Sequence, residues 1–229
     1  MESTWENTRV LKSSLAVQTA DILRKKIISG ELALGERLVD ANLAEAFGIS
    51  KVSIREAVLI LMKEQLLEKE KNKFTRVVVL SRNDVRELFE MRSAMEQIGV
   101  ERCIKDGTVP YEKLINQANK IKSLIGNNQQ AINGETFIDE DMRFHQIIME
   151  ACGNKRALNT WKQIEAQTKI LFYSQIKRNP FSVSNEPEQS HENIAFVMKQ
   201  GKVEEAKALI RWHLYGAYEA RISDPSLTD

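Results

Sequence analysis

The sequence has few of the residues that interrupt helices or cross-link extracellular domains. It contains four prolines and two cysteines in 229 residues. With so few prolines, long helices can run without interruption. The cysteines, Cys103 and Cys152, are far apart and follow no metal or disulfide pattern. They are therefore expected to be reduced thiols of a cytoplasmic protein.

Long apolar runs are also missing. No run of about 18 apolar residues occurs, so no membrane-spanning helix is expected. The first residues, MESTWENTRVLKSS, are polar and lack the apolar segment of a secretion signal. Hydrophobic residues nevertheless make up 42% of the chain, which is enough to build a core.

A large excess of positive charge is missing too, because the formal net charge is +1. Residues 1–80 carry +2 and residues 81–229 carry −1. Any DNA-binding surface must therefore depend on where individual charges lie and not on a basic domain as a whole.

Hydrophobic spacing divides the chain into two domains, and the fold class is mainly α. The N-terminal part predicts helices over 16–29, 40–47 and from Ser50 to about 63, then two short strands within LLEKEKNKFTRVVVL. Beyond Asn83 the pattern predicts only helices, over 83–105, 110–126, 131–151, 155–178, 187–200 and 202–222. We therefore expect a flexible arm over 1–15, a helix-plus-hairpin domain over 16–80, and an all-α helical bundle over 83–222.

The stretch GERLVDANLAEAFGISKVSIREAVLILMKEQLL carries the pattern of two short helices joined by a tight turn. Gly48 permits the turn and Ser50 is a good N-cap for the second helix. The predicted buried residues are Leu43, Ala44 and Phe47 in the first helix and Ile54, Val58, Leu61 and Met62 in the second.

The first turn of that second helix would leave Lys51, Val52, Ser53 and Arg55 on the outer side. A helix–turn–helix inserts such residues into the major groove of DNA, and Lys71–Lys73 at the hairpin tip would be a wing against the phosphates. The alternative is an amphipathic helical pair with a charged surface and no nucleic acid.

The motif G-E-R-L…L-A-x-x-F-G-I-S-x-x-x-[IV]-R-E-A-[LV] resembles the winged helix–turn–helix of GntR-type bacterial transcription regulators over residues 16–79. The resemblance implies a double-stranded DNA partner. The DNA-binding candidates are Arg37, Ser50, Lys51, Ser53, Arg55 and, in the wing, Lys73. The sequence departs from the family pattern at three places. Position 51 is Lys where many relatives have Arg, and the segment VDAN before Leu43 lacks the Arg that some relatives have there. Phe74 occupies the place of the glycine that is usual at the wing tip.

The chain has only three histidines, His145, His191 and His213. Asp141 and His145 are four residues apart, on one face of a predicted helix. The two side chains of such a pair can bind a metal ion, bind each other or have no functional role. The other two histidines lie on different predicted helices, so convergence on one ion is possible in a bundle but is not established by spacing.

The order D-x-x-x-H, Asn154, H-x-x-[IL] and a final H-L resembles the FCD effector domain of the FadR-like branch of this family, and the six helices resemble its VanR-like subgroup. The resemblance implies that Asp141, His145, His191 and His213 bind a divalent transition metal. Zinc is the first expectation, with nickel or manganese as alternatives.

Arg92 and Glu96 form another pair four residues apart. One reading is a surface salt bridge. The family pattern R-x-x-x-E instead implies that Arg92 points into a ligand cavity beside the metal, and the effector-binding candidates are Arg92 and Asn154. A metal together with a guanidinium suits a carboxylate. Trp161, Phe172 and Tyr173 are read as core or dimer packing.

These features together predict a ligand-responsive repressor that binds a palindromic operator as a homodimer and is released by a small organic acid or sugar acid. One alternative is a direct metal sensor. Another is a metal-dependent hydrolase with an accessory N-terminal domain.

Overall fold

The computed structural model describes residues 15–70, 74–126, 134–176, 190–223 and 227. The chain forms two compact units, Met1–Val78 and Val79–Asp229. The predicted arm lies outside the described residues except for Leu15, which begins the first helix. Lys73 at the wing tip also lies outside them.

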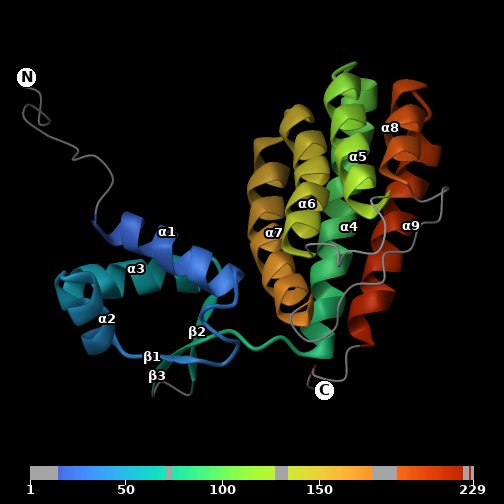
Figure 1. The fold of residues 1–229 in the computed structure, drawn as a ribbon. Coiled ribbons are helices and arrows are strands. Elements are labelled where there is room, and N and C mark those ends of the chain that lie inside the picture. Colours follow the sequence, from blue (N-terminus) through green and yellow to red (C-terminus); the bar gives the residue numbers. More distant parts are fainter. Residues whose placement is uncertain (1–14, 71–73, 127–133, 177–189, 224–226, 228–229) are drawn as a thin grey trace, which may run out of the picture. The chain divides into compact units, whose positions relative to one another are not determined.

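The first unit contains three helices and a small sheet among its described residues (Figure 1). The elements are α1 (Leu15–Ile28), β1 (Arg37–Leu38), α2 (Asp40–Phe47), α3 (Lys51–Lys63), β2 (Leu67–Glu70) and β3 (Phe74–Val77). The sheet is antiparallel in the order β1-β3-β2. The helices and the hairpin agree with the sequence prediction, whereas β1 was not predicted.

Two helices supply the core of this unit. Leu23 and Ile27 of α1 are buried, as are Ile54 and Leu61 of α3, and the two helices pack together. The predicted burial of Leu43, Ala44 and Phe47 in α2 was wrong, because these side chains are only partly buried and no residue of α2 is fully buried. An eight-residue helix at the surface has too little neighbouring structure to cover its apolar face.

The tight turn after α2 follows the predicted chemistry. Gly48 has φ +65°, a left-handed conformation that favours glycine. Ser50 then caps α3, and its side chain accepts a hydrogen bond from the Ser53 backbone N–H. The prediction that Met62 is fully buried was wrong, because its side chain is only half-buried.

The described part of the second unit consists of six helices (Figure 1). They are α4 (Arg82–Lys105), α5 (Tyr111–Gly126), α6 (Gly134–Ala151), α7 (Lys155–Ile176), α8 (His191–Lys199) and α9 (Val203–Ile222). Helix α4 packs against α6, α7 and α9, and α5 packs against α6 and α8. A capping box between Ser81 and Asp84 fixes the start of α4. The predicted all-α bundle is confirmed, and parts of the predicted helices 131–151, 155–178 and 187–200 lie outside the described residues.

None of the described helices is both long enough and apolar enough to span a membrane.

Candidate functional site

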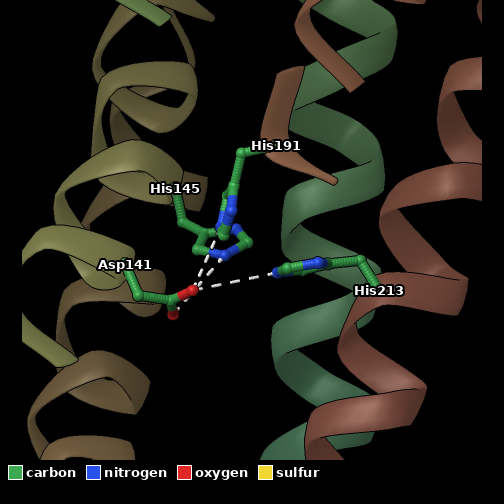
Figure 2. A group of neighbouring side chains, drawn as sticks. All are labelled: Asp141, His145, His191 and His213. Atoms are coloured by element: carbon green, nitrogen blue, oxygen red, sulfur yellow. Dashed lines mark ion pairs between the residues drawn. The ribbon is translucent and has the colours of Figure 1, made fainter. Parts of the chain in front are cut away.

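The structure brings the aspartate and all three histidines of the predicted metal set together (Figure 2). Asp141 and His145 lie on α6, His191 is the first residue of α8, and His213 lies on α9. One nitrogen or oxygen atom from each of the four residues lies within 4.8 Å of the other three. Three helices that are distant in sequence therefore present one group of ligand-type atoms.

The Asp141 carboxylate faces all three imidazoles. Its Oδ1 lies 3.0 Å from His191 Nε2 and 3.9 Å from His213 Nε2. Its Oδ2 lies 3.8 Å from His145 Nε2. Burial alone would raise the pKa of Asp141, but the hydrogen bond with His191 and the coulombic attraction of the three histidines lower it well below its usual range. Asp141 is therefore an anion, as a metal ligand must be.

The chemistry of the site fits a divalent transition metal. His145 Nε2 is buried and has no hydrogen-bond partner among the described residues. Burial also lowers the pKa of His191, against the opposing effect of Asp141, which favours the neutral imidazole that binds metals. Three imidazoles with one carboxylate suit zinc and also nickel or manganese.

A second carboxylate, Glu96 of α4, holds His145 from behind. Its Oε2 lies 2.6 Å from His145 Nδ1. Because a carboxylate only accepts, Nδ1 carries the proton and Nε2 is left with a free lone pair toward the other ligands. Trp161 Nε1 donates to Glu96 Oε1 at 2.9 Å. Sequence reasoning assigned Trp161 to the core, where it lies, but missed this hydrogen bond.

Burial alone would raise the pKa of Glu96. The coulombic attraction of His145 and Arg92, with hydrogen bonds from His145 and Trp161, outweighs it and lowers the pKa to about 2. Glu96 is thus a buried anion that is held by three neighbours.

Arg92 is that third neighbour, and it is not part of a surface salt bridge. Its Nε donates to Glu96 Oε1 at 2.7 Å, and both side chains are 1% exposed. The surface reading of this pair is therefore wrong. Arg92 Nη1 and Nη2 are buried with no hydrogen-bond partner among the described residues. A guanidinium whose two terminal nitrogens have no acceptor can donate one hydrogen bond to each oxygen of a bound carboxylate.

Asn154, the other predicted effector residue, lies directly before α7. Its Oδ1 accepts a hydrogen bond from the Ala157 backbone N–H at 3.1 Å, which is the geometry of a helix cap. Phe172 and Tyr173 are buried within the chain, as expected for core residues.

The predicted DNA-binding residues of the first unit lie at its surface. Lys51 and Arg55 are exposed on α3, and Arg37 is exposed on β1 with its guanidinium 4.9 Å from the Phe74 ring centroid. Arg55 Nε lies 3.2 Å from Asp40 Oδ2, and the Arg55 side chain is 68% exposed. The Ser50 hydroxyl is within hydrogen-bond distance of Ser53 Oγ as well as capping α3.

Two family models match this combination of units. The model described as bacterial regulatory proteins, gntR family, matches residues 15–77, and that of the FCD domain matches residues 87–216. The chain belongs to the GntR family. The FCD domain classifies it with the FadR-like branch, so the resemblance stated from sequence is confirmed, as is a winged helix–turn–helix followed by a helical FCD domain.

Curated relatives of this GntR-family chain are regulators. The gluconate operon transcriptional repressor of Bacillus licheniformis is 27% identical over 67% of this chain and 62% of the relative, so the match spans about three fifths of that protein. The probable D-xylose utilization operon transcriptional repressor of Paenarthrobacter nicotinovorans is 23% identical over 90% of this chain and 88% of the relative. These relatives give no support to the hydrolase alternative.

Solved structures share the fold. A putative transcriptional regulator GntR from Rhodococcus sp. RHA1 superimposes with a TM-score of 0.74 at 22% identity, covering 93% of this chain and 99% of that one. Escherichia coli McbR/YncC superimposes with a TM-score of 0.72 at 18% identity, covering 91% and 97%.

Proposed function

We propose that this GntR-family chain is a transcriptional repressor that binds a palindromic operator in the cytoplasm as a homodimer and releases it when a small organic acid or sugar acid binds its FCD domain. The observation that carries the effector assignment is the buried pair of Arg92 Nη atoms without a partner among the described residues. Buried guanidinium N–H groups that lack a hydrogen-bond acceptor cost folding free energy, and an anion that binds to them removes this cost.

Arg92 and the metal ligands would divide the work of holding the acid. Arg92 offers a planar pair of N–H donors, which matches one carboxylate in two hydrogen bonds. Asp141, His145, His191 and His213 would hold a divalent ion, with zinc as the first candidate and nickel or manganese next. Such an ion supplies Lewis-acid attraction for an oxygen of the effector.

Glu96 would hold Arg92 and the metal ligand His145 in fixed positions relative to each other. One of its oxygens accepts from Arg92 Nε and the other from His145 Nδ1. An acid that draws the Arg92 guanidinium toward itself therefore also acts on a carboxylate that orients a metal ligand. Only an effector with unequal affinity for the free and DNA-bound arrangements can release the operator.

The sugar-acid class has support from the relatives' names. One is named a gluconate operon repressor and another a probable D-xylose utilization operon repressor, so aldonic acids belong in the first panel of ligands. Asn154 stays a candidate for effector contact, although its side chain is occupied in capping α7.

A direct metal sensor is the second candidate. Four protein donors are enough to close a tetrahedral site, and a closed site leaves no position for an organic ligand. In that case metal alone would change operator affinity.

A thermal melt separates these candidates. The protein is melted with each of a panel of small carboxylates, both metal-loaded and after EDTA treatment. Ligand binding to the folded state raises the midpoint by mass action. We expect one acid to raise it in the metal-loaded sample alone. A shift with metal and none with any acid would favour the metal sensor.

Arg92→Lys tests, in the same thermal-melt assay, whether the two Nη groups of Arg92 bind the carboxylate. Lysine keeps the charge but cannot bind both oxygens in parallel, so we expect affinity for the active acid to fall about 10- to 100-fold. Lys105→Ala, an exposed change on the same helix, is the control and should leave the affinity unchanged. Equal affinity in Arg92→Lys and wild type would remove Arg92 from the effector site.

Arg55→Ala tests the recognition helix. We expect operator affinity to fall about 10- to 100-fold, because a base-contacting side chain is worth about 1–3 kcal/mol. Lys63→Ala, at the other end of α3, is the matched control. If both variants bind operator DNA equally well in a titration, the first turn of α3 does not read the DNA.

A further inference from the structure

A carboxylate of α2 holds the single arginine of the predicted recognition helix α3. Asp40 is the first residue of α2, and its Oδ2 accepts a hydrogen bond from Arg55 Nε at 3.2 Å. The two residues belong to the two helices on either side of the tight turn at Gly48. Their contact therefore arises from the helix–turn–helix fold and not from the spacing of residues along one helix.

The contact uses only one edge of the Arg55 guanidinium. Nε donates to Asp40, and the hydrogen bonds of the described residues leave Nη1 and Nη2 without an acceptor. The Arg55 side chain is 68% exposed and that of Asp40 is 33% exposed. Arg92 is arranged in the same way in the second unit, where Nε donates to Glu96 and both Nη atoms stay available for a ligand. Arg55 thus presents two held donors to the surface.

Other polar side chains in the first turn of α3 cannot replace these two donors. The hydroxyl of Ser53 lies 3.0 Å from Ser50 Oγ, so it already has a partner within the turn. Lys51 is exposed, but an ammonium group has no planar pair of donors for one base edge. Residues 1–80 carry a net charge of only +2, so selective binding must depend on directed donors and not on general attraction to phosphates.

The value of the Asp40–Arg55 pair lies in binding, because an exposed ion pair contributes little to the stability of a fold. A long side chain loses conformational freedom when it binds, and a side chain that is already held in place loses less. Guanine offers O6 and N7 as paired acceptors in the major groove, which match the two Nη donors. The Asp40 carboxylate also repels phosphate oxygens, which disfavours a contact of Arg55 with the DNA backbone.

We propose that Asp40 is a specificity-determining residue that positions Arg55 to read one guanine in each half-site of the operator. The inference rests on the proposed DNA-binding role of α3 and adds the base that this helix selects. Asp40 acts through Arg55, so its removal should change which base is preferred at one base pair, and not only how tightly DNA binds.

The test uses a pool of double-stranded DNA with a randomised centre, from which the full chain selects its binding sequences over successive rounds. We expect the wild type to enrich a guanine at one base pair of each half-site. In titrations with the selected DNA and with versions changed at that base pair, Asp40→Ala should show a preference for guanine about 10-fold smaller than that of the wild type. Arg55→Ala should lose its preference at the same base pair. A merely structural role of Asp40 would lower the affinity for all of these DNAs equally.

Glu45→Ala is the matched control. Glu45 is an exposed carboxylate of the same helix and makes no hydrogen bond or ion pair with Arg55. Its removal changes the net charge by the same amount, so general attraction to phosphates increases similarly in both variants. We expect Glu45→Ala to keep the base preference of the wild type.

The outcomes separate this inference from the proposed function. A wild-type preference in Asp40→Ala overturns the inference and leaves the proposed function intact, and so does enrichment of operator sequences without a guanine that depends on Arg55. A wild-type chain that enriches no sequence contradicts the proposed function, and the inference with it. Thermal melts identify any variant that fails to fold, and in that case Asp40→Ser, which keeps a small polar side chain without the charge, is judged by the same criterion.

Discussion

At the scale of single residues, Glu96 connects the parts of the site that sequence patterns treat separately. It accepts hydrogen bonds from Arg92 and Trp161 on one oxygen and from His145 on the other. The R-x-x-x-E pattern drew attention to Arg92, while the role of the glutamate toward a metal ligand appears only when α4 and α6 are packed together. Outer-shell carboxylates of this kind set the orientation of ligating histidines.

Glu96→Gln should weaken metal binding about 10- to 100-fold, as loss of an outer-shell carboxylate commonly does. The amide oxygen can still accept hydrogen bonds from Arg92 and Trp161. The amide NH₂ group, however, cannot accept a hydrogen bond from His145 Nδ1–H. The imidazole then loses the partner that fixes its metal-binding tautomer. Competition with a chromophoric chelator measures the affinity.

Glu101→Gln is the control for this substitution. Glu101 lies on the same helix and pairs with Lys105 and Lys207 outside the metal cluster. Wild-type metal affinity in Glu96→Gln, with Glu101→Gln also unchanged, would show that His145 needs no outer partner.

At the scale of elements, α3 shows how far local sequence determines structure. Its bounds agree with the prediction because Ser50 caps its start and its apolar positions repeat at helical spacing. Strand β1 shows the opposite case. It has two residues, and it is a strand because Arg37 and Leu38 pair with Arg76 and Thr75 of β3. A two-residue segment has no alternation to read, so the distant partner decides its conformation.

Ser50→Ala should lower the free energy of unfolding of the first unit by about 1 kcal/mol, the usual loss of an N-cap. The Ser53 backbone N–H would lose its side-chain acceptor. Ser50→Thr keeps a hydroxyl and should recover most of the stability. Urea titration followed by circular dichroism measures both, and equal stability of Ala and Thr variants would contradict a capping role.

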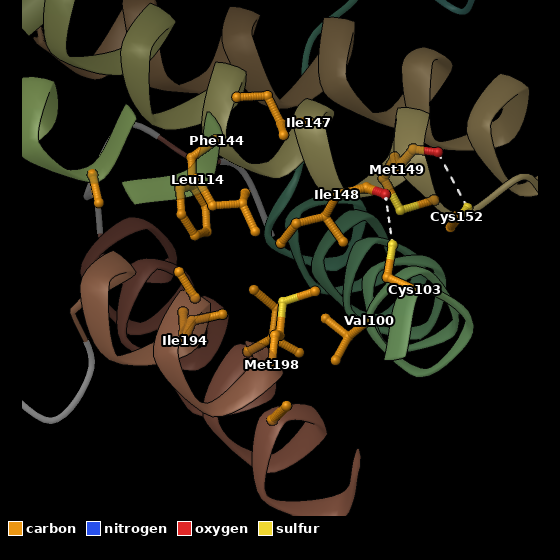
Figure 3. Close-up of a cluster of buried hydrophobic side chains, with 14 of the residues drawn as sticks. Val100, Cys103, Leu114, Phe144, Ile147, Ile148, Met149, Cys152, Ile194 and Met198 are labelled. Carbon is orange, nitrogen blue, oxygen red and sulfur yellow. Dashed lines mark hydrogen bonds between the residues drawn. The ribbon is translucent and has the colours of Figure 1, made fainter. Parts of the chain in front are cut away.

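At the scale of the whole molecule, both thiols are enclosed in the core of the second unit (Figure 3). Cys103 Sγ donates to the Ile148 carbonyl and Cys152 Sγ to the Met149 carbonyl. Burial raises the pKa of Cys103 to about 11. The sequence predicted reduced thiols, and the core explains why they would stay unreactive.

We therefore expect neither thiol to react appreciably with a disulfide reagent at pH 8 while the chain is folded. With a pKa of about 11, the buried Cys103 thiol is almost entirely protonated at that pH and therefore a poor nucleophile. Unfolding in guanidinium should release two reactive thiols per chain. Fast reaction of either thiol in the native protein would mean that the core of the second unit opens readily.

Removal of the metal should destabilise the second unit as a whole, because its ligands come from α6, α8 and α9. At a free metal concentration 100 times Kd, binding contributes about 2.7 kcal/mol, so EDTA should lower the midpoint by roughly 5–10 °C. His213→Ala should melt like the EDTA-treated wild type and gain nothing from added metal. A metal-dependent rise in that variant would exclude His213 from the ligand set.

The sequence by itself determined the helices, the turn at Gly48, the cap at Ser50 and the family. Each of these depends on residues within a few positions of one another or on a continuous motif, so periodicity and spacing contain the information. It also supplied the four metal-ligand candidates through the order of their motifs.

Only the tertiary structure decided what depends on helices meeting in space. Asp141, His145, His191 and His213 share one site because α6, α8 and α9 converge, and Arg92 is buried because its face of α4 packs against neighbouring helices of the bundle. The depth of α2 burial and the pairing of β1 have the same origin. Burial and convergence are properties of the packed chain, and a linear pattern cannot specify which face of a helix its distant neighbours will cover.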